Sequence, residues 1–212
     1  MHNKKRLKEI LEEVPPDYYQ KGVKNNLLQK LWHTGKLKAV MNFIIREPKK
    51  ILDVGCASGW FLNKVSENCK DAKCYGVDAY RDAILYGKKQ YKFLQLKHAD
   101  AHNLSYPSQT FDLVLCTEVL EHVSNPKLVL KEIKRVLTKN GIAIIEMDSG
   151  SILFNLIWYW WTHMRNGVWK QAHLHLFNAN KLEKLIKKSG FLIIDKKFFN
   201  FGMAVLFKVK IL

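Results

Sequence analysis

The chain has 212 residues, 48% of them hydrophobic, and its 35 Lys and Arg residues outnumber its 19 Asp and Glu residues, giving a formal charge of +16. This length and composition agree with one soluble domain that has a sizeable core. The four cysteines form no C-x-x-C pair, which excludes a zinc-finger module and favours reduced, mostly buried thiols in a cytoplasmic protein.

The positive charge has two explanations. Basic proteins often bind nucleic acid or anionic membrane surfaces. The lysines are spread along the chain, however, which favours a solvated lysine-rich surface and makes nucleic acid the weaker alternative. The first six residues carry charges with no apolar stretch after them, so we do not expect a secretory signal.

Residues 1–47 are predicted to be helical. Apolar residues recur at helical spacing in the first helix, and Pro15-Pro16 ends it. A second helix is predicted from Leu27 through the apolar stretch that reaches Ile45. The apolar residues of the first helix are Leu7, Ile10, Leu11 and Val14, and the aromatic and imidazole side chains that follow are Tyr18, Tyr19, Trp32 and His33.

Residues 51–60, ILDVGCASGW, form the most informative stretch of the chain. The apolar positions around Asp53 suit a parallel strand buried on both faces. Gly55 and Gly59 allow a sharp turn and the close approach of a ligand, which in open α/β sheets binds outside the carboxyl ends of the strands. The G-x-x-x-G spacing without a following Lys matches neither the dinucleotide loop nor the P-loop, so we expect a nucleoside ligand without a pyrophosphate.

Two further strands are predicted to end near an acidic residue. Residues 74–78 end in Asp78, which stands where a carboxylate accepts hydrogen bonds from ribose hydroxyls. Residues 93–98 form the next strand, and Asp100 follows it. Each Asp alone could be a turn or helix-cap residue. Asp53, Asp78 and Asp100 in succession at strand ends favour a binding edge instead.

The fourth and fifth strands are predicted at 111–116 and 142–147. Residues 111–126, FDLVLCTEVLEHVSNP, and the following L-x-E-I-x-R-V-L-x-x-x-G resemble class I S-adenosylmethionine-dependent methyltransferases, as does LDVGCASGWFL at 52–62. The resemblance covers about residues 48–148 and points to the subgroup with quinone-biosynthesis and small-molecule methyltransferases.

This resemblance implies an α/β fold with a doubly wound, mostly parallel seven-stranded sheet and an antiparallel final strand. It implies a helical lid at 1–47 and a methyltransferase core at 48–212. The implied cofactor is S-adenosylmethionine, with Asp100 and Ala101 at its adenine. The implied cofactor-binding residues are Asp53, Gly55, Cys56, Ala57, Gly59, Asp78, Asp100, Ala101 and Thr117.

The core carries an aromatic insertion at about residues 149–177. Ile152–Trp161 is strongly apolar, but it is too short for a membrane span, which needs about 20 apolar residues. One alternative is a helix buried at the sheet edge or in a homodimer. The other is a cover over an apolar acceptor that contacts lipid, which Arg165 and Lys170 would favour at an anionic surface.

Histidines near the predicted ligand edge are candidate bases for an acceptor hydroxyl. His122, just past the fourth strand, is the first candidate, and His175 and His173 follow. The spacing Glu118-x-x-Glu121-His122 also resembles the metal-binding element of some O-methyltransferases, because positions i, i+3 and i+4 share one face of a helical turn. The same letters occur in relatives with no metal, and we expect a metal-free site.

We therefore expect S-adenosylmethionine-dependent methyl transfer to a small or lipid-like acceptor, most simply at oxygen. An RNA methyltransferase, favoured by the charge, and a non-catalytic cofactor-binding member are the alternatives. The intact acidic strand ends argue against loss of the cofactor. The expected partners are the substrate, a peripheral membrane contact through 152–161 and a second copy of the chain.

Overall fold

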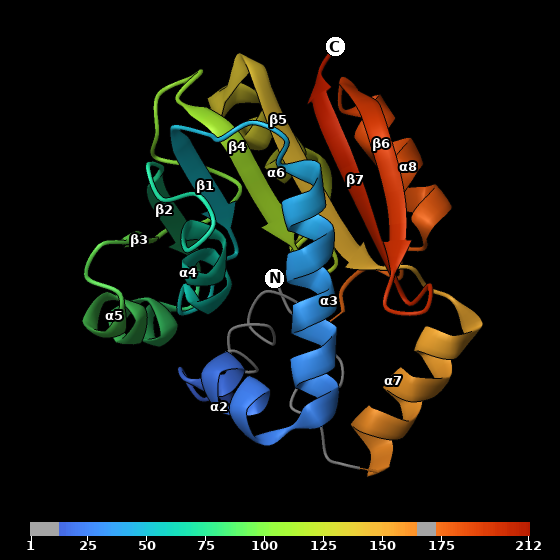
Figure 1. The fold of residues 1–212 in the computed structure, drawn as a ribbon. Coiled ribbons are helices and arrows are strands. Elements are labelled where there is room, and N and C mark those ends of the chain that lie inside the picture. Colours follow the sequence, from blue (N-terminus) through green and yellow to red (C-terminus); the bar gives the residue numbers. More distant parts are fainter. Residues whose placement is uncertain (1–12, 165–172) are drawn as a thin grey trace.

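The computed structural model describes residues 13–164 and 173–212, without the side chains of residues 161–164. Seven strands form one sheet with helices on both faces (Figure 1). Neighbouring strands are parallel except around β7, which runs antiparallel to both of its neighbours. The predicted fold is therefore confirmed. The strands in sheet order are β3 (Gln95–His98), β2 (Lys73–Asp78), β1 (Lys50–Val54), β4 (Phe111–Thr117), β5 (Leu137–Asp148), β7 (Ala204–Ile211) and β6 (Phe191–Phe199).

Some predicted features lie outside the described residues. They are the first three apolar residues of the first predicted helix, the side chain of Trp161, and the basic residues Arg165 and Lys170.

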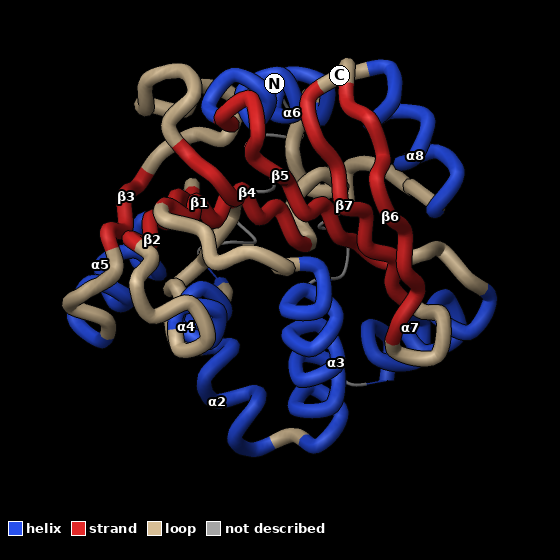
Figure 2. Tube along the Cα trace, turned by 45° about the horizontal axis from the view of Figure 1, so that its top comes forward, coloured by secondary structure: helices blue, strands red, loops and turns tan. Residues whose placement is uncertain are grey.

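Two groups of helices cover the two faces of the sheet (Figure 2). One face packs against α3, α4 and α5, and the other packs against α6 and α8. Two more helices, α2 and α7, lie beyond the carboxyl ends of the parallel strands, near the amino end of α3 (Figure 1). The helix bounds are α2 (Tyr18–Asn25), α3 (Leu27–Phe43), α4 (Trp60–Ser66), α5 (Arg81–Gln90), α6 (Pro126–Val136), α7 (Ile152–Met164) and α8 (Ala179–Lys188).

The central strand β1 explains the apolar run that marks it in the sequence. Ile51 packs in the cluster that contains α3, and Leu52 and Val54 pack in the cluster that contains α6. All three side chains are fully buried because helices cover both faces of a parallel sheet. Burial of each such side chain contributes about 1.5–3 kcal/mol, so the strand end that carries the site is rigidly held.

Helix α3 buries two polar side chains beside the apolar residues Ala39, Val40 and Phe43, and exposes the leucines at its amino end. Asn26 caps its amino end by accepting a hydrogen bond from the backbone N–H of Gln29. The buried residues of the helix include His33 and Lys36, whereas Leu27 is 70% exposed. Leu28 and Leu31 are exposed too. The leucines that predict the helix therefore face away from the sheet.

Helix α7 contains the apolar stretch 152–161 of the aromatic insertion. Phe154 is buried, but Ile152, Leu153 and Leu156 are exposed, and Ile152 is 80% exposed. The alternative in which this segment is wholly buried within the fold therefore does not hold for these aliphatic side chains. No helix in the described part of the chain combines the length and the apolar character needed to cross a membrane.

Candidate active site

The candidate active site lies at the carboxyl ends of the central strands. The chain runs from β1 outward through β2 to β3 and then returns to β4 on the opposite side of β1. In such a doubly wound sheet the reversal of strand order opens a crevice for a ligand. Asp53, Asp78 and Thr117 stand at the carboxyl ends of β1, β2 and β4, at this reversal.

The turn after β1 brings backbone close to the crevice. Gly55 has a φ of +79°, and a Cβ at this position would lie 2.2 Å from Cγ2 of Val119, so glycine is required. The carboxylate of Asp78 accepts hydrogen bonds from the backbone N–H groups of Ala57 and Tyr80, each at 2.7 Å. Burial raises the pKa of Asp78, although the two amides oppose that shift. Asp78 thus links the loop after β1 to the carboxyl end of β2.

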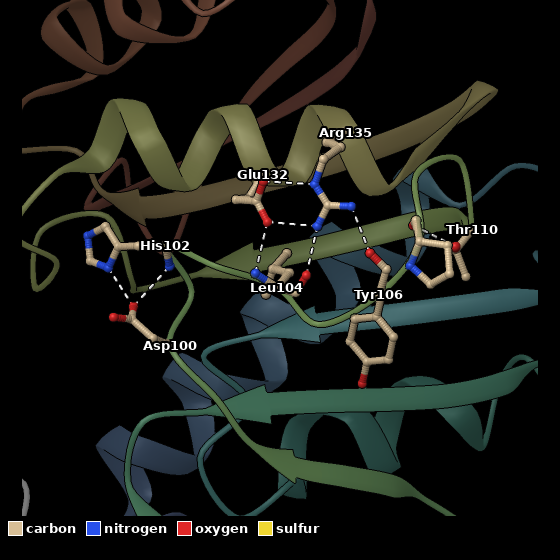
Figure 3. Close-up of polar contacts among 8 residues, drawn as sticks. Asp100, His102, Leu104, Tyr106, Thr110, Glu132 and Arg135 are labelled. Carbon is tan, nitrogen blue, oxygen red and sulfur yellow. Dashed lines mark hydrogen bonds and ion pairs between the residues drawn. The ribbon is translucent and has the colours of Figure 1, made fainter.

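The loop after β3 carries Asp100 and Ala101, the residues that the resemblance places at adenine. The Asp100 carboxylate accepts a hydrogen bond from the backbone N–H of His102 and contacts its ring (Figure 3). The Asp100 side chain is exposed and Ala101 is partly buried. Their roles at the cofactor stay predictions.

Helix α6 holds the next part of this loop. The backbone N–H of Leu104 donates to Oε2 of Glu132 at 2.8 Å, and Arg135 donates to the carbonyl oxygens of Leu104 and Tyr106, each at 2.7 Å (Figure 3). Glu132 and Arg135 also pair with each other. Because these charge-assisted bonds go to backbone, they fix the path of the loop that carries Asp100.

A lysine of α3 that sequence reasoning missed reaches the site. Lys36 is 3% exposed, and its Nζ lies 2.9 Å from Oε2 of Glu118 and 3.7 Å from Oε2 of Glu146. Trp32, one turn earlier, donates its Nε1–H to Oε1 of Glu118 at 2.9 Å. Glu118 follows β4 and Glu146 lies near the end of β5. These contacts tie α3 to the ends of two central strands.

Burial and charge give the carboxyl groups of this cluster different protonation states. Burial alone would raise the pKa of Glu118, but the neighbouring Lys36 lowers it to about 2, so Glu118 is ionised at neutral pH. Burial raises the pKa of Glu146 to about 8, with Lys36 opposing the shift. Burial and the nearby charge of Asp78 raise the pKa of Asp53 to about 8 as well.

Several buried polar atoms in this cluster lack a hydrogen-bond partner among the described residues. They are Oδ1 of Asp53, Oε2 of Glu121, Nδ1 of His33 and both carboxylate oxygens of Glu146. Such atoms are rare in folded proteins, and a bound ligand or water would satisfy them. S-adenosylmethionine carries sulfonium and ammonium cations, which suit carboxylate oxygens, and ribose hydroxyls, which suit Asp78. The residues present therefore fit this cofactor.

His122 and His173 meet beside Glu121. Their ring centroids are 5.0 Å apart, and Nε2 of His122 lies 4.0 Å from Oε1 of Glu121. His173 stacks on the ring of Trp158 at 4.9 Å, so α7 forms a wall of this group. Burial and the nearby His122 lower the pKa of His173 to about 4, which keeps its ring neutral at pH 7.

The predicted metal element has a different geometry. Residues 118–125 form bends and turns, and Glu118 has a φ of +55° and pairs with Lys36. The alternative of a metal element in which Glu118, Glu121 and His122 share one face of a helical turn therefore does not match the structure. Among the described residues, Glu121, His122 and His173 have ligand atoms within 4.8 Å of one another, a geometry that could hold a metal ion.

His175 is held by backbone. Its Nε2 lies 2.9 Å from the carbonyl oxygen of Val123, so this nitrogen carries the proton and donates it. The backbone N–H of His175 donates to the carbonyl oxygen of Glu121. His175 thus positions the turn that carries Glu121, while its catalytic role stays a prediction.

The raised pKa of Asp53 gives a pH dependence that can be measured. The unfolded carboxyl ionises near pH 4, whereas the folded one stays protonated up to about pH 8. The stability that Asp53 contributes is therefore full at acid pH and is lost as the pH rises through 8. We expect Asp53→Asn to flatten the fall in melting temperature between pH 5 and 8 without cofactor, as followed by circular dichroism.

The exposed Asp82→Asn is the matched control for this experiment and should keep the slope of the parent. A slope that stays unchanged in Asp53→Asn would mean that Asp53 is ionised in the fold.

Comparisons with known proteins agree with this geometry. The profile of the methyltransferase domain family matches residues 27–196. The ubiquinone/menaquinone biosynthesis C-methyltransferase UbiE of Campylobacter jejuni is 23% identical over 238 aligned positions, which cover 99% of each chain. A ubiquinone biosynthesis O-methyltransferase of Azoarcus is 38% identical over 85 residues, 37% of this chain and 35% of that one.

The solved structures share the fold. A SAM-dependent methyltransferase from Thermotoga maritima has a TM-score of 0.74 at 20% identity and covers 96% of this chain and 99% of its own. At that identity the likeness shows the fold alone. The family profile spans well over half of the chain. The chain therefore belongs to the methyltransferase domain family, as an S-adenosylmethionine-dependent methyltransferase.

Proposed function

We propose that this methyltransferase methylates a hydroxyl group of a small, lipid-like acceptor and that His122 receives the hydroxyl proton. The proposal rests on the cluster of His122, His173 and Glu121 beside the ring of Trp158. This cluster places side chains that can accept a proton next to an aromatic wall. A base within reach of an acceptor hydroxyl is what methylation at oxygen requires.

When bound, S-adenosylmethionine supplies a methyl group on an activated sulfonium centre. The protein therefore contributes mainly alignment, which can be worth about 7–11 kcal/mol. Asp53, which is buried, and Asp78, which is partly buried, would hold the cofactor, and Glu118 is fixed by Lys36 and by Trp32. His122 takes the proton as the acceptor oxygen is methylated.

A row of aromatic rings supports an apolar acceptor. Trp32 of α3 lies 6.4 Å from Phe154 of α7, and Phe154 stacks on Trp158 at 5.7 Å between ring centroids. The row ends at His173. An apolar chain or ring in contact with this row would bring its hydroxyl to the histidine pair.

The base supports an acceptor that carries a hydroxyl group, but it does not by itself distinguish methylation at oxygen from methylation at carbon. The relatives include one enzyme named as a C-methyltransferase and one named as an O-methyltransferase. An acceptor carbon next to a phenolic hydroxyl would use the same base, so the methylated atom has to be determined on the product. An RNA acceptor would be favoured by charge and not by the aromatic row.

His122→Ala should lower turnover by about 10²–10⁴-fold with little change in cofactor affinity. The assay follows labelled methyl transfer to lipid, quinone, sugar and RNA fractions, with cofactor affinity measured by calorimetry. His175→Ala is the comparison, because its ring contacts backbone at 2.9 Å. An unchanged turnover in His122→Ala would remove His122 as the base.

The effect of a chelator on activity distinguishes a metal-free base at His122 from a metal site. We expect activity to survive chelation, as a metal-free base requires. Activity that is lost with chelator and restored by magnesium would instead assign Glu121, His122 and His173 to a divalent ion. A product methylated at carbon, or only in the RNA fraction, would overturn the proposed acceptor chemistry.

A further inference from the structure

Two segments of the sequence lack acidic residues. Residues 18–46 and 149–182 contain nine Lys and Arg residues and no Asp or Glu, so all 19 acidic residues lie elsewhere. The first segment contains α2 and α3, and the second contains α7. All three helices have an end at the carboxyl edge of the sheet, around the candidate site (Figure 1).

The same two segments expose large aliphatic side chains. We call the following set the apolar rim: Leu27, Leu28 and Leu31 of α3, and Ile152, Leu153 and Leu156 of α7. A soluble monomer rarely exposes such side chains together unless they contact a partner. Lys24 and Lys30 are exposed beside the leucines of α3. The rim is therefore apolar with a cationic border.

Contacts place the two halves of the rim next to each other and next to the site. Trp32 follows Leu31 on α3, and its ring lies 6.4 Å from that of Phe154 on α7. Figures 1 and 2 both show α7 and the amino end of α3 on the same side of the sheet. The strand arrows in Figure 1 show that this is the side of the carboxyl ends of the parallel strands. The Nε1–H of Trp32 donates to Glu118 in the site. An occupant of the rim would thus lie at the entrance to the site.

We propose that the apolar rim docks this enzyme on an anionic membrane surface, so that a lipid-like acceptor enters the site from the bilayer. Aliphatic side chains inserted below the headgroups with lysines above them are the features of an interfacial helix. Each lysine near an anionic surface adds to the attraction.

Two other occupants fit the rim less well. A nucleic acid would use the lysines but would gain little from exposed leucines, because its backbone offers phosphates. A second copy of the chain would bring the exposed lysines of one rim against those of the other, and these like charges would repel each other. Of these three occupants, an anionic bilayer suits both the apolar and the cationic parts of the rim.

Vesicle flotation tests the docking. The full chain should float with vesicles of phosphatidylcholine and phosphatidylglycerol and stay in solution with phosphatidylcholine alone. Leu27→Ser/Leu31→Ser should weaken partitioning by more than about tenfold, through loss of inserted apolar area. Lys24→Gln/Lys30→Gln should weaken it by about thirtyfold at low salt, through loss of two charges.

The matched control removes aliphatic side chains elsewhere. Leu192→Ser/Ile194→Ser changes two half-exposed residues of β6 at the opposite end of the sheet and should bind vesicles like the parent. Circular dichroism must show that each variant is folded, and Ile152→Ser/Leu156→Ser replaces the α3 variant if that one unfolds.

Three results would overturn the inference. They are no flotation of the parent with anionic vesicles, equal flotation of the rim variants and the control, or a stable dimer that the rim variants dissociate. Vesicle binding is measured without methyl transfer. A failure of the proposed acceptor chemistry therefore leaves this test unaffected, and a failure to float leaves the acceptor assay valid.

Discussion

Asp78→Ala is expected to weaken S-adenosylmethionine binding by about 10–150-fold, as measured by calorimetry. Asp78 is a partly buried acceptor, and its carboxylate already accepts hydrogen bonds from the backbone N–H groups of Ala57 and Tyr80. Its removal takes a charged acceptor from the ribose and also releases the turn after β1. A hydrogen bond to a charged group is worth about 1.5–3 kcal/mol, which sets this range.

The control variants separate charge from shape. Asp82→Ala removes an exposed carboxylate from the first turn of α5 and should bind the cofactor like the parent. Asp78→Asn keeps one acceptor oxygen and should fall between the parent and Asp78→Ala. If Asp78→Ala binds as tightly as the parent, Asp78 is not the ribose residue. If the parent itself shows no heat and no thermal shift with S-adenosylmethionine, the cofactor assignment is wrong.

Lys36→Met should cause the largest loss of stability among single changes near the site. It removes the buried cation 2.9 Å from the ionised Glu118, whose side chain is 26% exposed. Breaking one side of a buried ion pair costs about 3–5 kcal/mol. For a chain of this size the melting temperature should fall by on the order of 10 °C, as followed by thermal denaturation.

Lys38→Met, an exposed lysine on the same helix, is the matched control and should melt like the parent. Lys36→Met/Glu118→Gln should recover much of the lost stability, because Gln keeps an oxygen for Trp32 and carries no charge. A parent-like melting temperature for Lys36→Met alone would show that Glu118 is neutral or solvated in the fold.

The sheet could be predicted from the sequence because its central strands are apolar runs bounded by turn residues. The apolar run at Ile51–Val54 is followed by glycines, and Phe111–Cys116 is apolar at nearly every position. Such runs between turn residues predict strands of a parallel sheet, and a resemblance over residues 48–148 supplies their order. The observed β5 starts earlier than predicted, at Leu137. Helix α6 ends at Val136, and β5 begins at the next residue.

Only some of the site residues could be predicted from the sequence, because the side chains that contact one another in the site come from distant parts of the chain. Lys36 looks like any surface lysine of a helix, and only tertiary structure shows that Glu118, 82 positions later, neutralises it. The group at His122 required His173, which is brought in by the insertion. No periodicity predicts the left-handed backbone of Glu118, which redirects its carboxylate toward α3.

The place of β7 between β5 and β6 has a consequence for synthesis of the chain on the ribosome. Antiparallel pairing joins Asp148 to Ala204, so the outer edge of β5 has no partner strand while the 55 residues between them are made. At usual bacterial and eukaryotic translation speeds this takes roughly 3 to 11 s. During that interval β5 offers unpaired backbone and buried-type side chains to other nascent chains. The edge of β5 is therefore where chaperones or slow growth at low temperature would protect the yield of folded protein.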